Sequence, residues 1–418
     1  MMIRGVCRVA AVSLLLLLVS GSPATAADAI RIGVLNPLSG NLAPLGQDST
    51  TGAEVARDMV NERGGVAGMR VEYAKADAPS ATAAVTEAAR LLDQEGVKII
   101  IGAYGSSISL AASAEAEKHK AIFWEMNSGS LKITGRGQRY TFRTTLTFKH
   151  LAEGAANALT EVVAPRLKAK PTALRVVMML EDSAYGSGMR PLLEEALAKA
   201  GIKPLAIEMY NAKSTDLSPL VLRFKDLAPD VVIASSYAND AILFARQARQ
   251  YDFNFKALIG TGAGHGQADL VKALGKNADG IFTTGATLTI NPAGLKPEAK
   301  ALLDEFNKRF EKKAGHFAST HGAMGFMGAW FLLTEVLPRT GGSTDPEKVR
   351  AAAYEADIPI GGGINGFGLK FDPTGQNERA FSVVQQWQEG RLAAVYPTAL
   401  ATHPPILVPL ARWKDRPE

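Results

Sequence analysis

Two hydrophobic patterns alternate along the chain. Short runs rich in valine, isoleucine and leucine are typical of buried strands, and longer segments with apolar residues at helical spacing separate them. Helical segments at 52–65, at 81–96 and after Ser107 separate four strand-like runs, at 30–35, 69–77, 97–101 and 121–126. Strands that alternate with helices of this length predict parallel pairing, right-handed crossovers and a sheet covered on both faces.

The alternation restarts after a long helical segment at 148–173. Helical segments again separate four strand-like runs, at 174–182, 203–210, 231–236 and 256–260. The chain is also long enough for two domains. The predicted fold class is therefore α/β, with two doubly wound α/β lobes joined by a hinge and a ligand cleft between them.

The last quarter of the chain departs from this alternation. Three helical segments between 297 and 355 are followed by three short strand-like runs, at 366–372, 380–390 and 391–397. Such a meander is expected to add edge strands to an earlier sheet, which requires more than one crossing between the lobes. The expected boundaries are 28–147 and 281–357 for the first lobe, and 148–280 and 358–418 for the second.

The first 26 residues are typical of a secretory signal peptide. Arg4 and Arg8 precede an apolar run at 9–19, and small residues lead up to Ala26, after which we expect cleavage. The run is too short for a membrane-spanning helix, which needs about 20 residues. We therefore expect export to the periplasm or another extracytoplasmic space.

Composition and charge exclude several other classes. Cys7 is the only cysteine and precedes the apolar run, which disfavours a lipid anchor and leaves the mature chain without a disulfide. Removal of Arg4 and Arg8 lowers the formal net charge from +5 to +3, and the charges are scattered, so no nucleic-acid partner is expected. The apolar run at 324–337 is short and contains a glutamate, so it predicts a buried helix.

Small polar residues follow two of the predicted strands. The run at 97–101 stops at Gly102, and Ser106, Ser107 and Ser109 lead into an alanine-rich helix. Ligands of open α/β sheets bind at such strand ends, and a helix that begins there presents unpaired N–H groups that suit an anion. A serine that only caps the helix is the alternative interpretation.

A second loop strengthens the interpretation as an anion site. Asn127, Ser128, Gly129 and Ser130 follow the strand-like run at 121–126. Two neighbouring strand ends with small polar residues favour a carboxylate site over two coincidental helix caps.

The residue patterns of common catalytic sites are missing from the sequence. It contains no GxSxG nucleophile elbow, and His316 and His321 are five apart, which suits no common zinc motif. The GxGxxG match at 361–366 precedes a strand and is interpreted as a turn. The glycine-rich stretch at 260–266 has the wrong spacing for a nucleotide loop, but its place after a strand predicts a loop at the cleft. We expect no enzymatic activity, no cofactor and no metal.

Five stretches of the chain resemble the type I periplasmic binding proteins of ABC transporters, specifically the leucine/isoleucine/valine-binding group. They include "PLSG" after the first strand and "GGVAG" before the second, and they cover residues 30–80, 99–113, 133–144, 181–189 and 222–249. The resemblance implies a monomer that clamps an amino acid or a related organic acid or amide between two lobes and delivers it to the permease subunits of an importer. A secreted sensor and, further away, an exported enzyme are the alternatives.

The resemblance also implies which residues face the ligand. In the family, loops that match the two serine-rich loops here bind the ligand's carboxylate, and the second lobe supplies aromatic residues. His321 matches a position that often holds an aromatic residue. The predicted binding residues are Tyr104, Ser106, Ser107, Asn127, Ser128, Ser130, Tyr185, Tyr237, Gly262 and His321.

One position departs from the amino-acid-binding members. These members carry an acid, in the loop after the strand at 256–260, that pairs with the ligand's ammonium group, whereas Gly262 stands here. A missing charged hydrogen bond forfeits ~1.5–3 kcal/mol, or roughly ten- to a hundredfold in affinity. Either Asp240 or Glu125 supplies the charge, or the ligand has no ammonium group, as in members that bind carboxylates, amides or urea.

Overall fold

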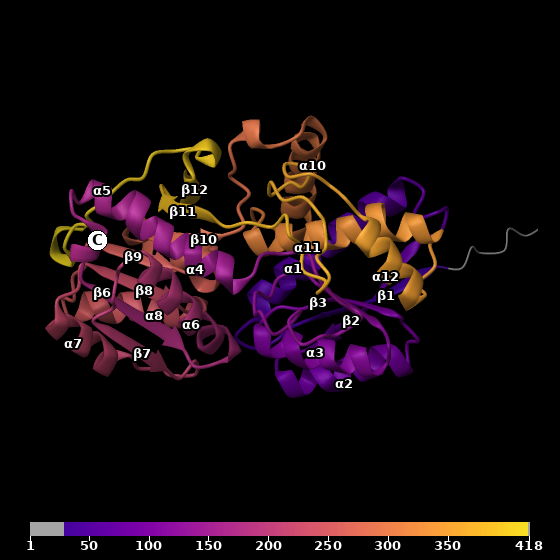
Figure 1. The fold of residues 1–418 in the computed structure, drawn as a ribbon, viewed down its shortest axis with the longest axis horizontal. Helices are drawn as coiled ribbons and strands as arrows, with labels where there is room; N and C mark the ends of the chain where they lie inside the picture. Colours follow the sequence, from indigo (N-terminus) through magenta and orange to yellow (C-terminus); the bar gives the residue numbers. More distant parts are fainter. Residues whose placement is uncertain (1–28, 417–418) are drawn as a thin grey trace, which may run out of the picture.

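The computed structural model describes residues 29–416, which form two α/β lobes side by side (Figure 1). The first lobe contains a five-stranded sheet with the strand order β2-β1-β3-β4-β5. The second contains a seven-stranded sheet with the order β12-β11-β10-β9-β8-β6-β7. The predicted fold class is confirmed. The predicted signal peptide at 1–26 lies outside the described residues.

The first sheet is parallel throughout, as the alternation of strands and helices predicts. Its strands and connecting helices are β1 (Ile30–Asn36), α1 (Ala43–Glu62), β2 (Val71–Asp77), α2 (Ala81–Asp93), β3 (Ile99–Gly102), α3 (Ser106–Lys118), β4 (Ile122–Glu125) and β5 (Thr141–Arg143). Three later helices complete this lobe, namely α10 (Pro297–Ala314), α11 (Thr320–Phe331) and α12 (Pro346–Glu355).

The second sheet is parallel from β7 to β10 and antiparallel at the edge formed by β11 and β12. This edge confirms the pairing of the last two strand-like runs, at 380–390 and 391–397. The predicted edge strand at 366–372 is wrong, because within residues 29–416 this run forms only isolated bridges, with Ile358 and Asn377, and most of its apolar side chains pack in the first lobe. The elements are α4 (Phe148–Asn157), α5 (Ala164–Arg166), β6 (Val176–Glu181), α6 (Ala184–Lys199), β7 (Ala206–Tyr210), α7 (Ser218–Leu227), β8 (Val231–Ser235), α8 (Ala238–Gln250), β9 (Ala257–Gly260), α9 (Ala268–Leu274), β10 (Phe282–Gly285), β11 (Val383–Gln388) and β12 (Arg391–Tyr396).

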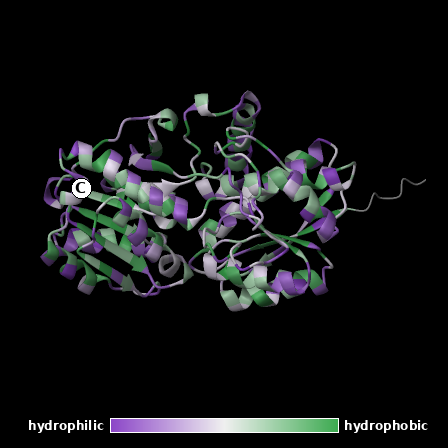
Figure 2. Cartoon of the chain, viewed as in Figure 1, coloured by the Kyte–Doolittle hydropathy of each residue, from purple (hydrophilic) through white to green (hydrophobic). Residues whose placement is uncertain are grey.

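Both faces of each sheet are buried, which is why the central strands are continuous apolar runs (Figure 2). In β3, Ile99 and Ile101 pack into the core shared with α1 and α11, and Ile100 points to the opposite core, under α2 and α3. The run at 324–337 belongs to α11 and the helical turns after it, and it is largely buried, as predicted.

The structure corrects two of the expected lobe boundaries. The short strand β10 pairs with β9 and β11, so the chain crosses back to the first lobe after Gly285 and not before residue 281. Leu369 and Phe371 pack in the first core, and Ala380 packs in the second, so the final crossing comes well after residue 358. Both positions depend on pairings and packing between distant segments, which local patterns do not encode.

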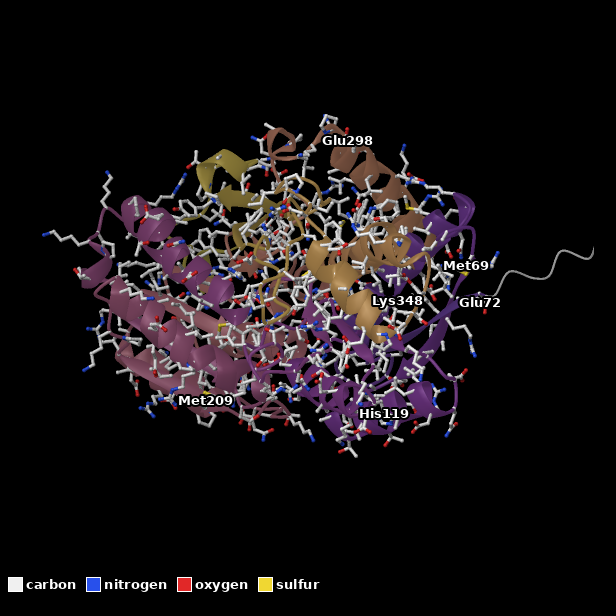
Figure 3. The ribbon with its side chains drawn as sticks, turned by 45° about the vertical axis from the view of Figure 1, so that its right-hand side comes forward. Met69, Glu72, His119, Met209, Glu298 and Lys348 are labelled. Carbon is white, nitrogen blue, oxygen red and sulfur yellow. The ribbon has the colours of Figure 1, made fainter. Side chains whose placement is uncertain are left out.

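Charged side chains project from the outside of the first lobe, as the labelled Glu72, Glu298 and Lys348 illustrate in Figure 3. Among residues 29–416 there is no helix with the length and apolar character needed to cross a membrane.

Candidate ligand-binding site

A cavity of about 80 Å³ lies between the two lobes. A buried water needs roughly 10–15 Å³ of such space, so the cavity has the size for a small metabolite. Most of its wall comes from the segments that follow β3, β4, β8, β9 and β10, together with the first turns of α4, α6 and α11. The carboxyl ends of the parallel strands of both sheets therefore meet at this cavity, as expected for an open α/β fold.

The first lobe supplies a polar wall at the start of α3. Gly105 precedes the helix with φ of 89°, a conformation that favours glycine. Ser106, the first helical residue, borders the cavity, and within residues 29–416 its hydroxyl has no hydrogen-bond partner. Because the first N–H groups of a helix lack partners inside the helix, this wall offers backbone and hydroxyl donors to an anion. Ser107 does not border the cavity.

The loop after β4 forms the rest of the polar wall. Ser128 Oγ accepts a hydrogen bond from Ser109 Oγ at 2.7 Å, and Asn127 Nδ2 donates to Ser49 Oγ at 2.7 Å. Asn127 borders the cavity, and its Oδ1 atom is buried without a partner in the described part of the chain. Ser130 lies outside the wall, where its carbonyl accepts a hydrogen bond from Arg143 at 2.6 Å.

Glu125 is hydrogen-bonded to the backbone of this loop and does not border the cavity. Its Oε1 atom accepts the backbone N–H groups of Asn127 and Ser128 at 2.8 and 2.7 Å. Burial raises the pKa of the Glu125 carboxyl to about 7, although hydrogen bonds from Ser109 and the loop partly offset this. Burial also lowers the pKa of the nearby Arg143 guanidinium to about 10. Glu125 thus orders the loop and is not placed to meet a ligand's ammonium group.

Asp240 does not border the cavity either. Its carboxylate accepts a hydrogen bond from the Tyr210 hydroxyl, and burial raises its pKa to about 7. Gly262 has no side chain and lines the cavity with backbone only. Its φ of 85° lies in the region that favours glycine. Neither acid that could have replaced the missing charge borders the cavity.

The second lobe supplies an aromatic wall. The rings of Phe148, Tyr185 and Tyr237 form a row with centroid separations of 5.4 and 5.3 Å. The Tyr185 hydroxyl donates to the carbonyl of Thr261 at 2.9 Å, so this ring is fixed to the loop after β9. Burial raises the pKa of Tyr185 and of Tyr237, which keeps both phenols neutral.

Tyr104 and His321 close the cavity from the first lobe. Their rings meet edge to face with centroids 4.8 Å apart. The His321 side chain is buried, which lowers its pKa to about 3, and its Nδ1 atom lies 2.5 Å from Gln267 Nε2 in the second lobe. At neutral pH this histidine is therefore uncharged.

The structure brings most of the predicted binding residues together. Eight border the cavity, namely Tyr104, Ser106, Asn127, Ser128, Tyr185, Tyr237, Gly262 and His321, whereas Ser107 and Ser130 do not. Sequence reasoning missed several other wall residues, including Phe148, Thr283, Thr284, Met324 and Gln385. Phe148 carries a usable signal, since it follows the threonine-rich stretch 144–147 at the start of the long helical segment.

Comparison with known proteins identifies the family. A sequence profile described as "Periplasmic binding protein" matches residues 29–391. Leu/Ile/Val-binding protein homolog 8 of Brucella melitensis is 34% identical over 370 residues, which cover 88% of this chain and 90% of the relative.

Solved structures share the fold. The leucine binding protein LivK of Thermotoga maritima matches with a TM-score of 0.75 at 24% identity, over 89% of this chain and 99% of that one. An ABC transporter solute-binding protein from R. palustris, in complex with benzoate, matches with a TM-score of 0.74 at 19% identity, over 91% and 99% of the two chains. The chain therefore belongs to the type I periplasmic binding protein family, in its leucine/isoleucine/valine-binding group.

Proposed function

We propose that the protein is the extracytoplasmic solute-binding component of an ABC importer, and that its solute is a small, mainly apolar organic acid without an ammonium group. One observation carries the proposal. Among the described residues, the wall of the cavity contains no aspartate, glutamate, lysine or arginine. The solute must therefore be recognised by uncharged donors, uncharged acceptors and aromatic surface.

A carboxylate fits this wall without a cationic side chain. The start of α3 carries a partial positive charge from the aligned peptide dipoles, and its first N–H groups lack partners inside the helix. The Ser106 hydroxyl adds a donor at the same end. Together these groups can replace much of the water that the carboxylate loses on binding.

An ammonium group fits poorly. Neither of the two polar loops brings a charged acceptor to the wall of the cavity, among residues 29–416. A charged partner would add ~1.5–3 kcal/mol, so an amino acid is expected to bind roughly ten- to a hundredfold more weakly than the same acid without its ammonium group.

The aromatic wall favours a flat or branched apolar body. The row of Phe148, Tyr185 and Tyr237 offers ring faces and edges, and such contacts contribute about 0.5–1.5 kcal/mol beyond the area they bury. Related folds include one named as a leucine binding protein and one in complex with benzoate. The uncharged wall here favours a solute that resembles benzoate over one that resembles leucine.

Two lobes with the site between them support a clamp mechanism. A solute held by the polar wall of the first lobe would contact the aromatic wall of the second only when the lobes close, so binding shifts the equilibrium toward the closed form. The closed form is then the species that docks on the permease subunits.

A thermal-shift screen of the mature protein, refolded to remove carried-over solute, tests the proposal. The panel contains benzoate, 4-hydroxybenzoate, phenylacetate, 4-methylpentanoate, leucine, benzamide and urea. A solute at a hundredfold excess over its Kd stabilises the native state by ~2.7 kcal/mol. We expect shifts with the acids that lack an ammonium group. A shift with leucine and none with 4-methylpentanoate would overturn the proposal.

A further inference from the structure

One hydrogen bond inside the site connects the two lobes. Gln267 follows the loop after β9 in the second lobe, and His321 lies in the first turn of α11 in the first lobe. Gln267 Nε2 and His321 Nδ1 are 2.5 Å apart, and both side chains are buried. Because the two residues belong to different lobes, this bond is made when the lobes are closed and lost when they separate.

The donor in this bond is fixed by its chemistry. An amide nitrogen donates and does not accept, so His321 Nδ1 must be the acceptor. The histidine is neutral because burial lowers its pKa to about 3. A neutral imidazole has one N–H group, which must then be on Nε2.

The Nε2 atom is free to contact a solute. Within the part of the chain that the structure describes, it has no hydrogen-bond partner, and the His321 ring borders the cavity. The edge-to-face contact with Tyr104, with centroids 4.8 Å apart, helps to fix the orientation of the ring. The ring can therefore present its second nitrogen to the solute.

The pair also separates two cavities. Gln267 borders a wider cavity of about 800 Å³ and His321 borders the solute cavity, and the two cavities share Gly266, Thr320 and Gln385. Breaking the bond would remove part of the partition between the solute and this outer space.

We infer that Gln267 is a positioning residue, which links the two lobes through its hydrogen bond to His321 and selects the Nε2–H tautomer of this histidine. In this tautomer, His321 donates a hydrogen bond to an acceptor atom of the solute. The donation to solute rests on the proposed function, whereas the selection of the tautomer does not. The consequence for specificity is that solutes with an oxygen acceptor at this end are preferred over equally sized solutes with a donor only.

The tautomer can be measured by NMR on the mature protein labelled with ¹⁵N-histidine. The His321 signals are assigned by their loss in His321→Phe. The spectrum is recorded with the protein saturated by whichever solute of the panel stabilises it, so that the lobes are closed, and we expect a pyridine-type Nδ1 and a pyrrole-type Nε2. A pyrrole-type Nδ1, or an equal mixture of the tautomers, would overturn the inference, whichever solutes bind.

Variants of Gln267 separate positioning from packing. Gln267→Leu removes the donor, so we expect a mixture of tautomers. Gln267→Glu supplies only an acceptor at neutral pH, so we expect the proton to move to Nδ1. Gln47→Leu is the matched control, because Gln47 borders the same outer cavity but donates to the carbonyl of Leu38, and it should leave the His321 spectrum unchanged. A spectrum that is the same in wild type and Gln267→Glu contradicts the inference.

Binding of benzoate and 4-hydroxybenzoate to the same variants tests the donation to solute. Loss of one neutral hydrogen bond predicts about three- to tenfold weaker binding in Gln267→Leu and in His321→Phe. Unchanged affinity in both variants would overturn the donor role. Absence of binding to wild type would overturn the proposed solute class and with it the donor role, while the NMR result would still decide the role of Gln267.

Discussion

The two walls of the cavity differ in how their residues are held. The polar wall of the first lobe depends on ionisable side chains buried behind it, since Glu125 and Arg143 anchor the loop whose side chains reach the cavity. The aromatic wall of the second lobe is held by ring contacts and by the hydrogen bonds of one phenol. The wall that meets the solute is therefore uncharged, whereas the loop behind it is held by the buried guanidinium of Arg143.

Arg143→Ala should have the largest effect, because it removes the cation that supports the polar wall. The guanidinium is fully buried and donates to Gln376 Oε1 at 2.5 Å and to the carbonyl of Ser130 at 2.6 Å. Breaking a buried charged network costs about 3–5 kcal/mol of the free energy of unfolding, measurable as a lower midpoint in urea. Arg31→Ala, which breaks an exposed ion pair with Glu95, should cost at most about 1 kcal/mol. Equal costs for the two variants would refute this view of the polar wall.

Ser106→Ala should weaken binding of every acid in the panel. Loss of a hydrogen bond to a carboxylate forfeits about 1.5–3 kcal/mol, or roughly ten- to a hundredfold in Kd by calorimetry. Ser107→Ala is the matched control, because Ser107 is the next residue of the helix but does not border the cavity. This variant should bind the acids as wild type does. If Ser107→Ala has the larger effect, the polar wall is assigned to the wrong face of α3.

Glu125→Gln should change how stability depends on pH. Burial raises the pKa of the Glu125 carboxyl from 4.5 to about 7, so the folded protein keeps this proton while the unfolded chain loses it. The free energy of unfolding should therefore fall as pH rises from about 4.5 to about 7, by about 1–3 kcal/mol from this residue. Urea midpoints measured across this range should fall less steeply in Glu125→Gln. An unchanged slope would show that the carboxyl is ionised in the folded state at these pH values.

Tyr237→Leu should have the smallest effect and should act on the aromatic wall alone. The variant keeps an apolar side chain but loses the ring that contacts Tyr185. Benzoate should bind about two- to tenfold more weakly, and 4-methylpentanoate should change less. If calorimetry shows the same loss of affinity for both acids, the wall contributes only buried apolar area and does not prefer aromatic solutes.

The sequence allowed the general position of both walls to be predicted, because strand ends and small polar loops are local features. It could not separate Ser106 from Ser107, since successive helical residues point about 100° apart and only the packing of α3 decides which one faces the cavity. Gln385 and Thr284 were missed because they lie on strands β11 and β10, whose pairing joins distant segments. Ser130 was predicted to bind ligand, but its carbonyl is used by Arg143.

The wall of the cavity contains no acid that could pair with an ammonium group, among the described residues. Calorimetry with two matched pairs tests the consequence for binding most directly, with leucine against 4-methylpentanoate and phenylglycine against phenylacetate, because each pair differs only by that group. We expect the acid without the ammonium group to bind roughly ten- to a hundredfold more tightly in each pair. Tighter binding of the two amino acids would contradict this expectation. It would mean that an aspartate or glutamate side chain of the protein reaches the cavity when the solute is bound.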